Sequence, residues 1–482
     1  MSSPFIRIIG GGLAGAEAAW QAATRGVPVV VHEMRPVRPT LVHKTAHLAE
    51  LVCSNSFRGD KLDNAVGLLK EEMRRLGSLV MRAAERARVP AGAALAVDRD
   101  LFAETVTEAL DRHPLVTIER EEVAGLPPAD GVISIVATGP LTSEALSTDI
   151  ASFVGSNHLY FYDAISPIVM AETLDRSKVF RASRWDRSFR GSGTDSATPA
   201  DDAGDYLNCP FTRDEYQRFL DAVLSAESAT VHDFDRERFF EGCLPIEVMA
   251  HRGRDTLRFG PMKPVGLIDP RTGRAPYAVA QLRQDNLAAD HYSLVGFQTQ
   301  LKWGEQGRVL RLIPGLEQAE FVRFGMVHRN TYINGPTVLR PTWQTRARDD
   351  LFFAGQVSGV EGYVESAASG LLSGWNAAAL ARGGRPVSAP RTTALGALAH
   401  YVSHADPAHY EPTNITFGIL PPLDDLASDS SNRGTSRHRP LKGVARKAAT
   451  SERALSDLDR WSREVGWFAA CDEMEPLGAA ER

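Results

Sequence analysis

The chain has 482 residues, of which 43% are hydrophobic and 24% are charged, and its formal net charge is −6. That composition is globular and excludes disordered and fibrous proteins. No apolar run reaches the ~18 residues that a membrane-spanning helix needs, so we expect neither a membrane anchor nor a signal peptide. The 4 cysteines are too few for a disulfide framework and lack metal-site spacing, so we expect no bound metal and a reducing, cytoplasmic location. The net charge gives no indication of a polyanionic partner. Only local clusters of basic residues would predict one.

The N-terminal segment alternates between strand and helix patterns. Residues 5–10 are typical of a strand, residues 16–25 are rich in helix formers, and residues 27–32 again predict a strand. A glycine loop joins the first strand to the helix. Together these elements predict the βαβ unit of a dinucleotide-binding fold.

The glycine loop has the GxGxxG spacing of a pyrophosphate-binding turn. Gly10 permits the tight turn, Gly12 lets backbone N–H groups approach a pyrophosphate, and Gly15 lets the helix pack on the strand. Glu33 ends the second strand, where its carboxylate is expected to accept hydrogen bonds from adenosine ribose hydroxyls. The residues predicted to bind the cofactor in this segment are Gly10, Gly11, Gly12, Leu13, Ala14, Gly15 and Glu33.

Further helices and strands continue this pattern. Residues 62–87 predict a mostly helical segment with an apolar stripe. Its charged residues are interpreted as a solvated face: Lys70, Glu71, Glu72, Arg74 and Arg75. Asp98 is expected to cap a helix that runs to Leu110, and residues 115–119 and 132–139 predict two more strands.

Changes in pattern along the chain suggest four segments. Residues 1–140 are expected to form the first part of a dinucleotide-binding domain. Residues 141–340 are less periodic and aromatic-rich, which predicts an inserted domain for substrate or RNA. Residues 341–426 return to a strand-then-helix pattern and would complete the first domain. Residues 427–482 begin with a basic stretch and end in an amphipathic helix.

A second glycine-containing strand end favours FAD over NAD. Residues 137–139 read ATG after an apolar strand, and residues 351–370 form another strand that ends in Ala-Gly before a small-residue helix. Such an element can bring backbone donors to a flavin, so Gly355 and Gln356 join the predicted cofactor site. The expected fold is therefore α/β, with an FAD-binding, glutathione-reductase-type Rossmann domain and an inserted α+β domain. Tight packing of a helix on a sheet is the alternative explanation for the small residues.

Several long strings resemble one enzyme family over roughly residues 5–465. They are ELVCSNSFR, NAVGLLKEEMR, VPAGAALAVDR, FEGCLPIEVMA, DTLRFGPMKPVGL, VGFQTQLKWGEQ, IPGLEQAEFVRFG and GVEGYVESAASG. The chain resembles the folate- and FAD-dependent tRNA (uracil-5-)-methyltransferases. The resemblance implies FAD, NADH or NADPH, 5,10-methylenetetrahydrofolate as carbon donor, a uridine of the tRNA T-loop as acceptor, and two functional cysteines. It indicates no obligate protein partner.

The chemistry of uracil methylation is well suited to a thiol as the attacking group. Uracil C5 is a poor nucleophile until a group adds at C6, and a thiolate adds there and leaves again readily. Cys53 and Cys243 lie in the strings above, and only the resemblance raises them above the alternative of buried, inert thiols. We assign the attack on C6 to Cys243, which is in the inserted segment, and a place near the flavin to Cys53. Cys209 and Cys471 are expected to be inert.

Three basic and aromatic stretches are candidates for folate or RNA contacts, and for the first of them ordinary surface charge is the alternative. The residues proposed are Arg258 and Lys263, Lys302 and Trp303, and Arg181 and Arg184. The basic stretch at 433–447 is either a solvated tail or a nucleic-acid contact. Two other functions stay open: the same chemistry on ribosomal RNA, and a flavoprotein scaffold that does not methylate.

Overall fold

The computed structural model describes residues 5–40, 42–155, 159–164, 166–186, 204–228, 244–423, 441 and 443–468. For residues 159–164 and 327–331 only the backbone is described. Among the described residues, no helix combines the length and the apolar character needed to cross a membrane.

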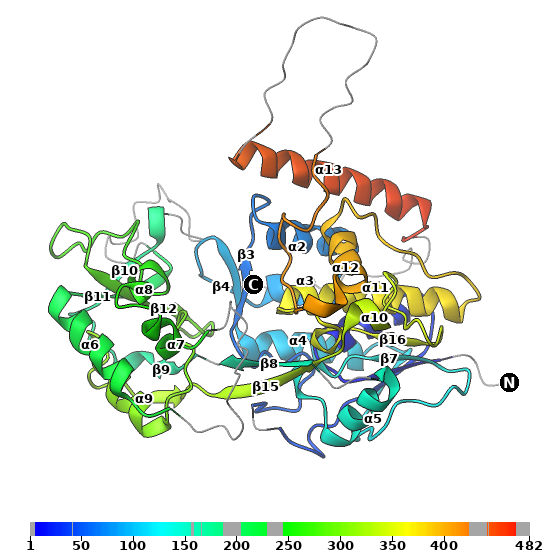
Figure 1. The fold of residues 1–482 in the computed structure, drawn as a ribbon, viewed down its shortest axis with the longest axis horizontal. Coiled ribbons are helices and arrows are strands. Elements are labelled where there is room, and N and C mark those ends of the chain that lie inside the picture. The colour runs from blue at the N-terminus through cyan, green and yellow to red at the C-terminus, as the bar shows by residue number, and fades with distance from the viewer. Residues whose placement is uncertain are drawn as a thin grey trace, which may run out of the picture.

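A five-stranded parallel sheet forms the centre of one lobe (Figure 1). Its strand order is β16 (Leu351–Phe353), β7 (Ile133–Val136), β1 (Ile6–Ile9), β2 (Val29–His32) and β6 (Val116–Glu119). The four neighbouring pairs are all parallel. Strands of a parallel sheet are covered on both faces, which explains the apolar Ile and Val runs. The predicted α/β class is confirmed.

Two helices rich in small residues cross closely on this sheet. α1 (Leu13–Ala23) follows the glycine loop, and α11 (Tyr363–Ala381) follows β16. A Cβ atom added at Gly370 would lie 2.1 Å from the carbonyl oxygen of Ala14, and one at Gly374 would lie 2.3 Å from that of Ala18. The backbones therefore meet directly, which fixes both glycine-containing strand ends relative to each other.

The second lobe is built on an antiparallel sheet. Its order is β10 (Phe180–Ala182), β11 (Tyr206–Phe211), β12 (Ala278–Gln284), β13 (His291–Leu294), β9 (Ile168–Met170) and β14 (Phe321–Arg323). The helices of this lobe are α6 (Arg213–Ser225), α7 (Ile246–His251), α8 (Thr256–Phe259) and α9 (Trp303–Leu310). The antiparallel pair β8 (Leu159–Ala164) and β15 (Val327–Tyr332) runs between the two lobes (Figure 1).

The remaining elements surround the parallel sheet. A small antiparallel sheet has the order β3 (Ser56–Gly59), β5 (Ala94–Val97) and β4 (Arg88–Val89). The helices are α2 (Ala65–Arg75), α3 (Leu79–Arg86), α4 (Arg99–Asp111), α5 (Glu144–Val154), α10 (Gly335–Val338), α12 (Ala394–His404) and α13 (Gly443–Glu464). Asp98 caps α4 as expected, because its carboxylate accepts from the amides of Asp100 and Leu101.

The interpretation of the charged residues of α2 as a solvated face was wrong for two of them. Lys70 and Glu72 are both fully buried. Lys70 Nζ donates to three main-chain carbonyls, and Glu72 accepts from the amides of Ala394 and Leu395 at 2.7 and 2.8 Å. The spacing of apolar residues along α2 cannot predict that the first residues of α12 pack against Glu72. The apolar stripe alone was therefore insufficient to identify the buried face.

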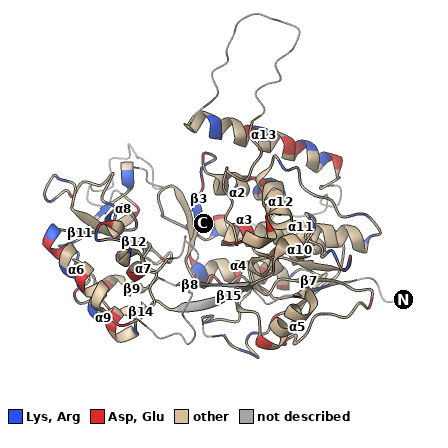
Figure 2. Ribbon diagram, viewed as in Figure 1, with Lys and Arg blue, Asp and Glu red and all other residues tan. Residues whose placement is uncertain are grey.

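The C-terminal helix packs on the first lobe. α13 lies along α2, and Figure 2 shows basic and acidic residues interspersed along its length. After it, Trp467 stacks on Trp375 with ring centroids 5.0 Å apart, and its indole N–H donates to Leu76 O at 3.0 Å. The guanidinium of Arg25 lies 4.7 Å from the same indole ring. Residues 454–467 therefore contribute to the core, through Ala454, Leu455, Leu458, Trp461 and Trp467. Most of the basic stretch at 433–447 lies outside the described residues.

Glu72 should make the stability of the fold depend on pH. Burial raises the pKa of Glu72 to about 8, although the two amides and Arg75 oppose the shift. Between its unfolded pKa near 4.5 and this value, the folded state retains a proton that the unfolded state releases. The free energy of unfolding should therefore fall as pH rises, by at most about 1.4 kcal/mol per pH unit.

Glu72→Gln removes this titration and should flatten the pH dependence of urea unfolding between mildly acidic and neutral conditions. Glu71→Gln is the matched control, because Glu71 is half-exposed and pairs with Arg75 on the surface. Identical slopes for the Glu72→Gln variant and the wild type would contradict a protonated, buried Glu72.

Candidate functional site

A cavity of about 560 Å³ lies between the parallel sheet and the antiparallel sheet. The ends of β1, β7 and β16 contribute Gly10, Ala137 and Gly355, and the antiparallel sheet contributes Arg283 and Ser293. The predicted residues that line it are Gly10, Gly12, Leu13, Ala14, Glu33, Cys53, Gly355 and Gln356. The cavity therefore brings both glycine-containing strand ends and one predicted catalytic cysteine together.

The glycine loop leaves open space where a ligand would approach. A Cβ atom at Gly12 would meet nothing within 4 Å, and the backbone there has φ −71°, which any residue adopts. Gly15 is different, because a Cβ atom would lie 1.8 Å from Gly10 O. Gly10 itself has φ +99°, in the region that favours glycine. Gly10 and Gly15 are thus needed for the backbone geometry of the turn, whereas Gly12 leaves open space for a ligand on the cavity side.

Glu33 is a buried carboxylate at the end of β2. Its Oε2 accepts from Gly11 N at 2.9 Å, and its Oε1 accepts from Arg35 Nε at 2.8 Å. Burial alone would raise the pKa of Glu33, but the hydrogen bonds and charge of Arg35, with the Gly11 amide, lower it. Glu33 is therefore ionised beside the loop, and both oxygens of an ionised carboxylate act only as hydrogen-bond acceptors.

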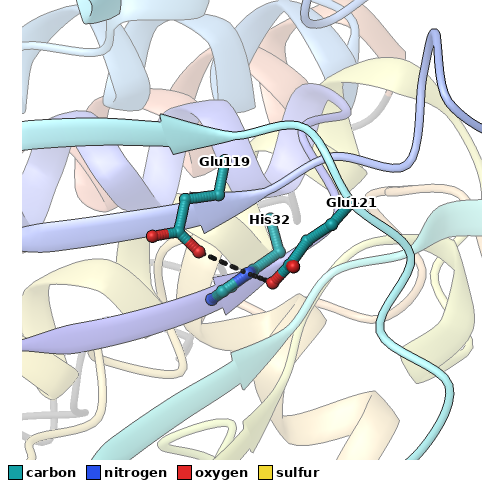
Figure 3. A group of neighbouring side chains, drawn as sticks. All are labelled: His32, Glu119 and Glu121. Atoms are coloured by element: carbon teal, nitrogen blue, oxygen red, sulfur yellow. Dashed lines mark hydrogen bonds and ion pairs between the residues drawn. The ribbon is translucent and has the colours of Figure 1, made fainter.

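A histidine and two glutamates meet beside Glu33, at the ends of β2 and β6 (Figure 3). His32 Nδ1 lies 2.9 Å from Glu121 Oε1 and 3.4 Å from Glu119 Oε2. Three such groups could hold a metal ion, but both glutamates are exposed and the shorter contact has the length of a hydrogen bond. His32 and Glu121 also line the cavity. The hydrogen bond between His32 and Glu121 at the cavity wall is therefore enough to explain why these three side chains lie together.

The strand end at β16 is held by side-chain hydrogen bonds. Gly355 has φ +76°, and its N–H donates to Ser369 Oγ at 2.7 Å. Gln356 Nε2 donates to Glu361 Oε2 at 2.7 Å. These contacts fix the backbone opposite the first glycine loop.

The loop that carries Cys53 is anchored by Tyr363, the first residue of α11. The Tyr363 hydroxyl oxygen accepts from Cys53 N at 2.8 Å and from Ser54 N at 3.0 Å. Burial raises the pKa of Tyr363 above its usual range, so its hydroxyl keeps its proton. The cysteine is thereby tied to the same helix that follows Gly355 and Gln356.

Three arginines surround the Cys53 loop. Arg99 donates to Leu51 O at 2.8 Å, Arg283 donates to Ser54 Oγ at 2.8 Å, and Arg323 donates to Val52 O at 3.1 Å. Each lies close enough to interact electrostatically with Cys53. The carboxylate of Asp285 pairs with Arg99 at 3.1 Å. The charged side chains around Cys53 are thus predominantly cationic.

Sequence reasoning missed Tyr363 and these arginines as site residues. Tyr363 and Arg323 both lie inside strings that carry the family resemblance, GVEGYVESAASG and IPGLEQAEFVRFG. The signal was therefore present, but only the fold shows that two segments far apart in sequence meet at Cys53.

Arg58 is another charged residue of the cavity wall. It has φ +61°, and its guanidinium pairs with the buried Glu365. Lys70 donates to the carbonyls of residues 57, 58 and 59, at 3.0, 3.1 and 2.8 Å, and so holds this strained segment. Burial lowers the pKa of Lys70 to about 8.

The predicted folate and RNA residues do not line this cavity. Arg258 lies over the ring of Tyr277 at 3.8 Å, Lys302 pairs with Glu227 at 2.6 Å, and Lys263 is exposed. Arg181 donates to Tyr292 Oη at 3.2 Å.

Two further predicted residues have other surroundings. Arg184 donates to Gln281 Oε1 at 3.0 Å and to Val265 O at 2.8 Å, so internal partners hold its guanidinium. Trp303 lines a second, smaller cavity.

Of the other cysteines, only Cys209 is described. It is fully buried on β11, and burial raises the pKa of its thiol, as expected of an inert residue. Cys243 and Cys471 lie outside the described residues. The description resumes at Leu244, and Ile246 N donates to the carbonyl of Gln298, a residue that lines the main cavity.

The comparisons with known proteins agree with this geometry. Residues 5–385 match the family model described as glucose inhibited division protein A. A methylenetetrahydrofolate–tRNA-(uracil-5-)-methyltransferase TrmFO of Pelotomaculum thermopropionicum is 56% identical over 465 residues, which cover 96% of this chain and all of that protein. The chain belongs to this methyltransferase family. The predicted family and enzyme class are thereby confirmed.

Other relatives and solved structures extend the comparison. The enzyme of the same name from Enterococcus faecalis is 56% identical over 428 residues, which cover 89% of this chain and 94% of that protein. The structure of Aquifex aeolicus GidA has a TM-score of 0.66 at 18% identity, covering 96% of this chain and 73% of that one. The GidA structure shows a shared fold.

Proposed function

We propose that this protein methylates C5 of a uridine in the T-loop of tRNA, in the cytoplasm, with carbon from 5,10-methylenetetrahydrofolate, FAD as cofactor and NADH or NADPH as reductant. The observation that carries the proposal is that Cys53 lines one cavity with the glycine loop and with Gly355. Family membership supports the folate and tRNA assignments, because the relatives carry both in their names.

The residues present fit an adenine dinucleotide. The space beside Gly12 would accept a pyrophosphate at the N-terminus of α1, where free N–H groups favour an anion. Glu33, ionised at the end of β2, would accept hydrogen bonds from ribose hydroxyls. Gly355 and Gln356 would face the other end of the group. When bound, FAD supplies the hydride that reduces the transferred carbon to a methyl group.

The thiol chemistry needs one cysteine to add to the base. A thiolate that bonds to uracil C6 pushes electron density to C5, which then bonds to the folate-derived carbon. The bond between this carbon and the folate nitrogen then breaks, so that tetrahydrofolate leaves, and loss of the C5 proton to solvent gives an exocyclic methylene. Addition of a hydride to that methylene and departure of the thiolate would give the methylated, aromatic base. We assign the thiolate addition to Cys243.

We assign Cys53 a place at the cofactor. Its loop is tied to Tyr363 and to three arginines, and it lines the cavity that also contains the glycine loop. Predominantly cationic surroundings would favour a negatively charged part of the folate beside this loop.

Gly12→Val should abolish FAD binding and leave the apoprotein folded. The valine side chain would fill the space assigned to the pyrophosphate, and its Cβ atom would lie more than 4 Å from the nearest protein atoms beyond its chain neighbours. The measurements are the ratio of flavin to protein after purification and the melting temperature of the apoprotein.

Gly304→Val is the matched control, because a Cβ atom at Gly304 also meets nothing within 4 Å and the residue lies on α9 outside the cavity. Wild-type flavin occupancy in the Gly12→Val variant would show that the pyrophosphate lies elsewhere.

Purified protein with FAD, labelled methylenetetrahydrofolate and NADH or NADPH should transfer the label to tRNA that contains the T-loop. Ribosomal RNA fragments serve as the competing substrate. With RNA that contains 5-fluorouridine, the wild type should form a covalent adduct, because no C5 proton can leave.

Cys243→Ala should form no adduct yet still allow NADH or NADPH to reduce FAD, whereas Cys53→Ala should alter the flavin spectrum during turnover. Cys209→Ala, a change at a buried residue outside the cavity, is the control and should form the adduct normally. An adduct that survives Cys243→Ala but not Cys53→Ala would reverse the assignment. No label in any RNA would refute the proposed function.

A further inference from the structure

A second cavity, of about 290 Å³, opens near the Cys53 loop but outside the main cavity. We call it the Trp303 pocket. It is lined by Val42, Lys44, Trp303, Phe321, Val322, Arg323, Phe324 and Met326. None of these residues lines the main cavity.

The Trp303 pocket offers flat apolar surfaces. The Trp303 side chain is 62% exposed at the first residue of α9. Phe321 and Phe324 stack on each other with centroids 4.9 Å apart and planes 24° apart. Exposed aromatic faces of this kind are where single-stranded nucleic acids stack their bases.

The charged residues that line the Trp303 pocket are both cations. Lys44 is exposed, and no carboxylate lines the pocket. Neighbouring Lys302 already pairs with Glu227, so it adds little net charge. Arg323 is half-buried, and within the described part of the chain its Nε is a buried donor with no hydrogen-bond partner. A ligand with an acceptor and a negative charge would satisfy both cations.

A thin wall separates the Trp303 pocket from the main cavity. Val42 and Val52 pack together with Leu141 and Met326; of these, Val52 and Leu141 line the main cavity, and Val42 and Met326 line the pocket. Arg323 also crosses this wall, because it lines the pocket and donates to the carbonyls of Val52 and Cys53 at 3.1 and 3.4 Å. The two cavities are therefore neighbours, and one RNA strand could occupy both.

We infer that the Trp303 pocket binds one nucleotide of the RNA beside the target uridine, with its base stacked on Trp303 and its phosphate at Lys44. The inference rests on the proposed function, because it takes the substrate to be RNA. Folate also combines a flat ring with negative charge, but its carbon must be delivered within the main cavity, behind the wall.

The experiment is a double-mutant cycle on the binding of a T-loop hairpin to the FAD-loaded protein, without folate or turnover. Each nucleotide beside the target uridine is replaced in turn by an abasic site. In the wild type, one abasic site should weaken binding roughly tenfold, the size expected for one lost stacking contact. Trp303→Ala should weaken binding of the intact hairpin by a similar factor, and the abasic site should then cost nothing more.

Trp303→Phe should retain most of the affinity, and Lys44→Ala should reduce the salt dependence by about one phosphate contact. Phe468→Ala changes an exposed aromatic residue four residues after the end of α13, and this variant should bind the hairpin normally. The affinity of the protein for methylenetetrahydrofolate should be unchanged in Trp303→Ala.

An abasic penalty that is the same in wild type and Trp303→Ala would overturn the inference. A loss of folate affinity with unchanged hairpin binding would also overturn it and would assign the pocket to folate. Failure of the proposed function is seen separately, as absence of label transfer by the wild type.

Discussion

The site depends on how the antiparallel sheet holds the Cys53 loop against the parallel sheet. Arg283 on β12 and Arg323 on β14 reach across to the loop, and Arg99 on α4 binds it from the first lobe. Hydrogen bonds from charged donors to buried acceptors contribute about 1.5–3 kcal/mol each. Because these bonds join two lobes, the position of the cysteine is set by both. Tyr363 adds a connection to α11 and so to the second glycine-containing strand end.

Two buried polar residues of α2 hold neighbouring elements in place. Lys70 holds the carbonyls around Arg58, whose left-handed backbone turns its guanidinium toward the cavity and Glu365. Glu72, two residues later, caps the start of α12. Removing one partner of such a contact leaves the other buried and unpaired, which is costly. Lys70 and Glu72 therefore make buried polar contacts on different sides of α2, Lys70 with β3 at the cavity wall and Glu72 with the start of α12, and neither faces solvent.

Local sequence patterns predicted much of the fold and part of the site. The glycine loop, Glu33 and the Ala-Gly strand end could be recognised because each depends on a few adjacent residues. Lys70 could not be interpreted correctly, since its three acceptors come from β3 and a helical pattern carries no information about them. The arginines around Cys53 were missed for the same reason: Arg99, Arg283 and Arg323 are far apart in sequence and meet only in the folded chain.

A structure of the protein with FAD bound is the most direct test of whether the two lobes hold Cys53 at the cofactor. We predict the pyrophosphate at Gly12, the ribose hydroxyls at Glu33, and the isoalloxazine ring against the loop of Cys53 and the side chain of Tyr363. A flavin ring turned away from the Cys53 loop, or FAD bound outside the main cavity, would contradict the claim that the two lobes hold this cysteine at the cofactor.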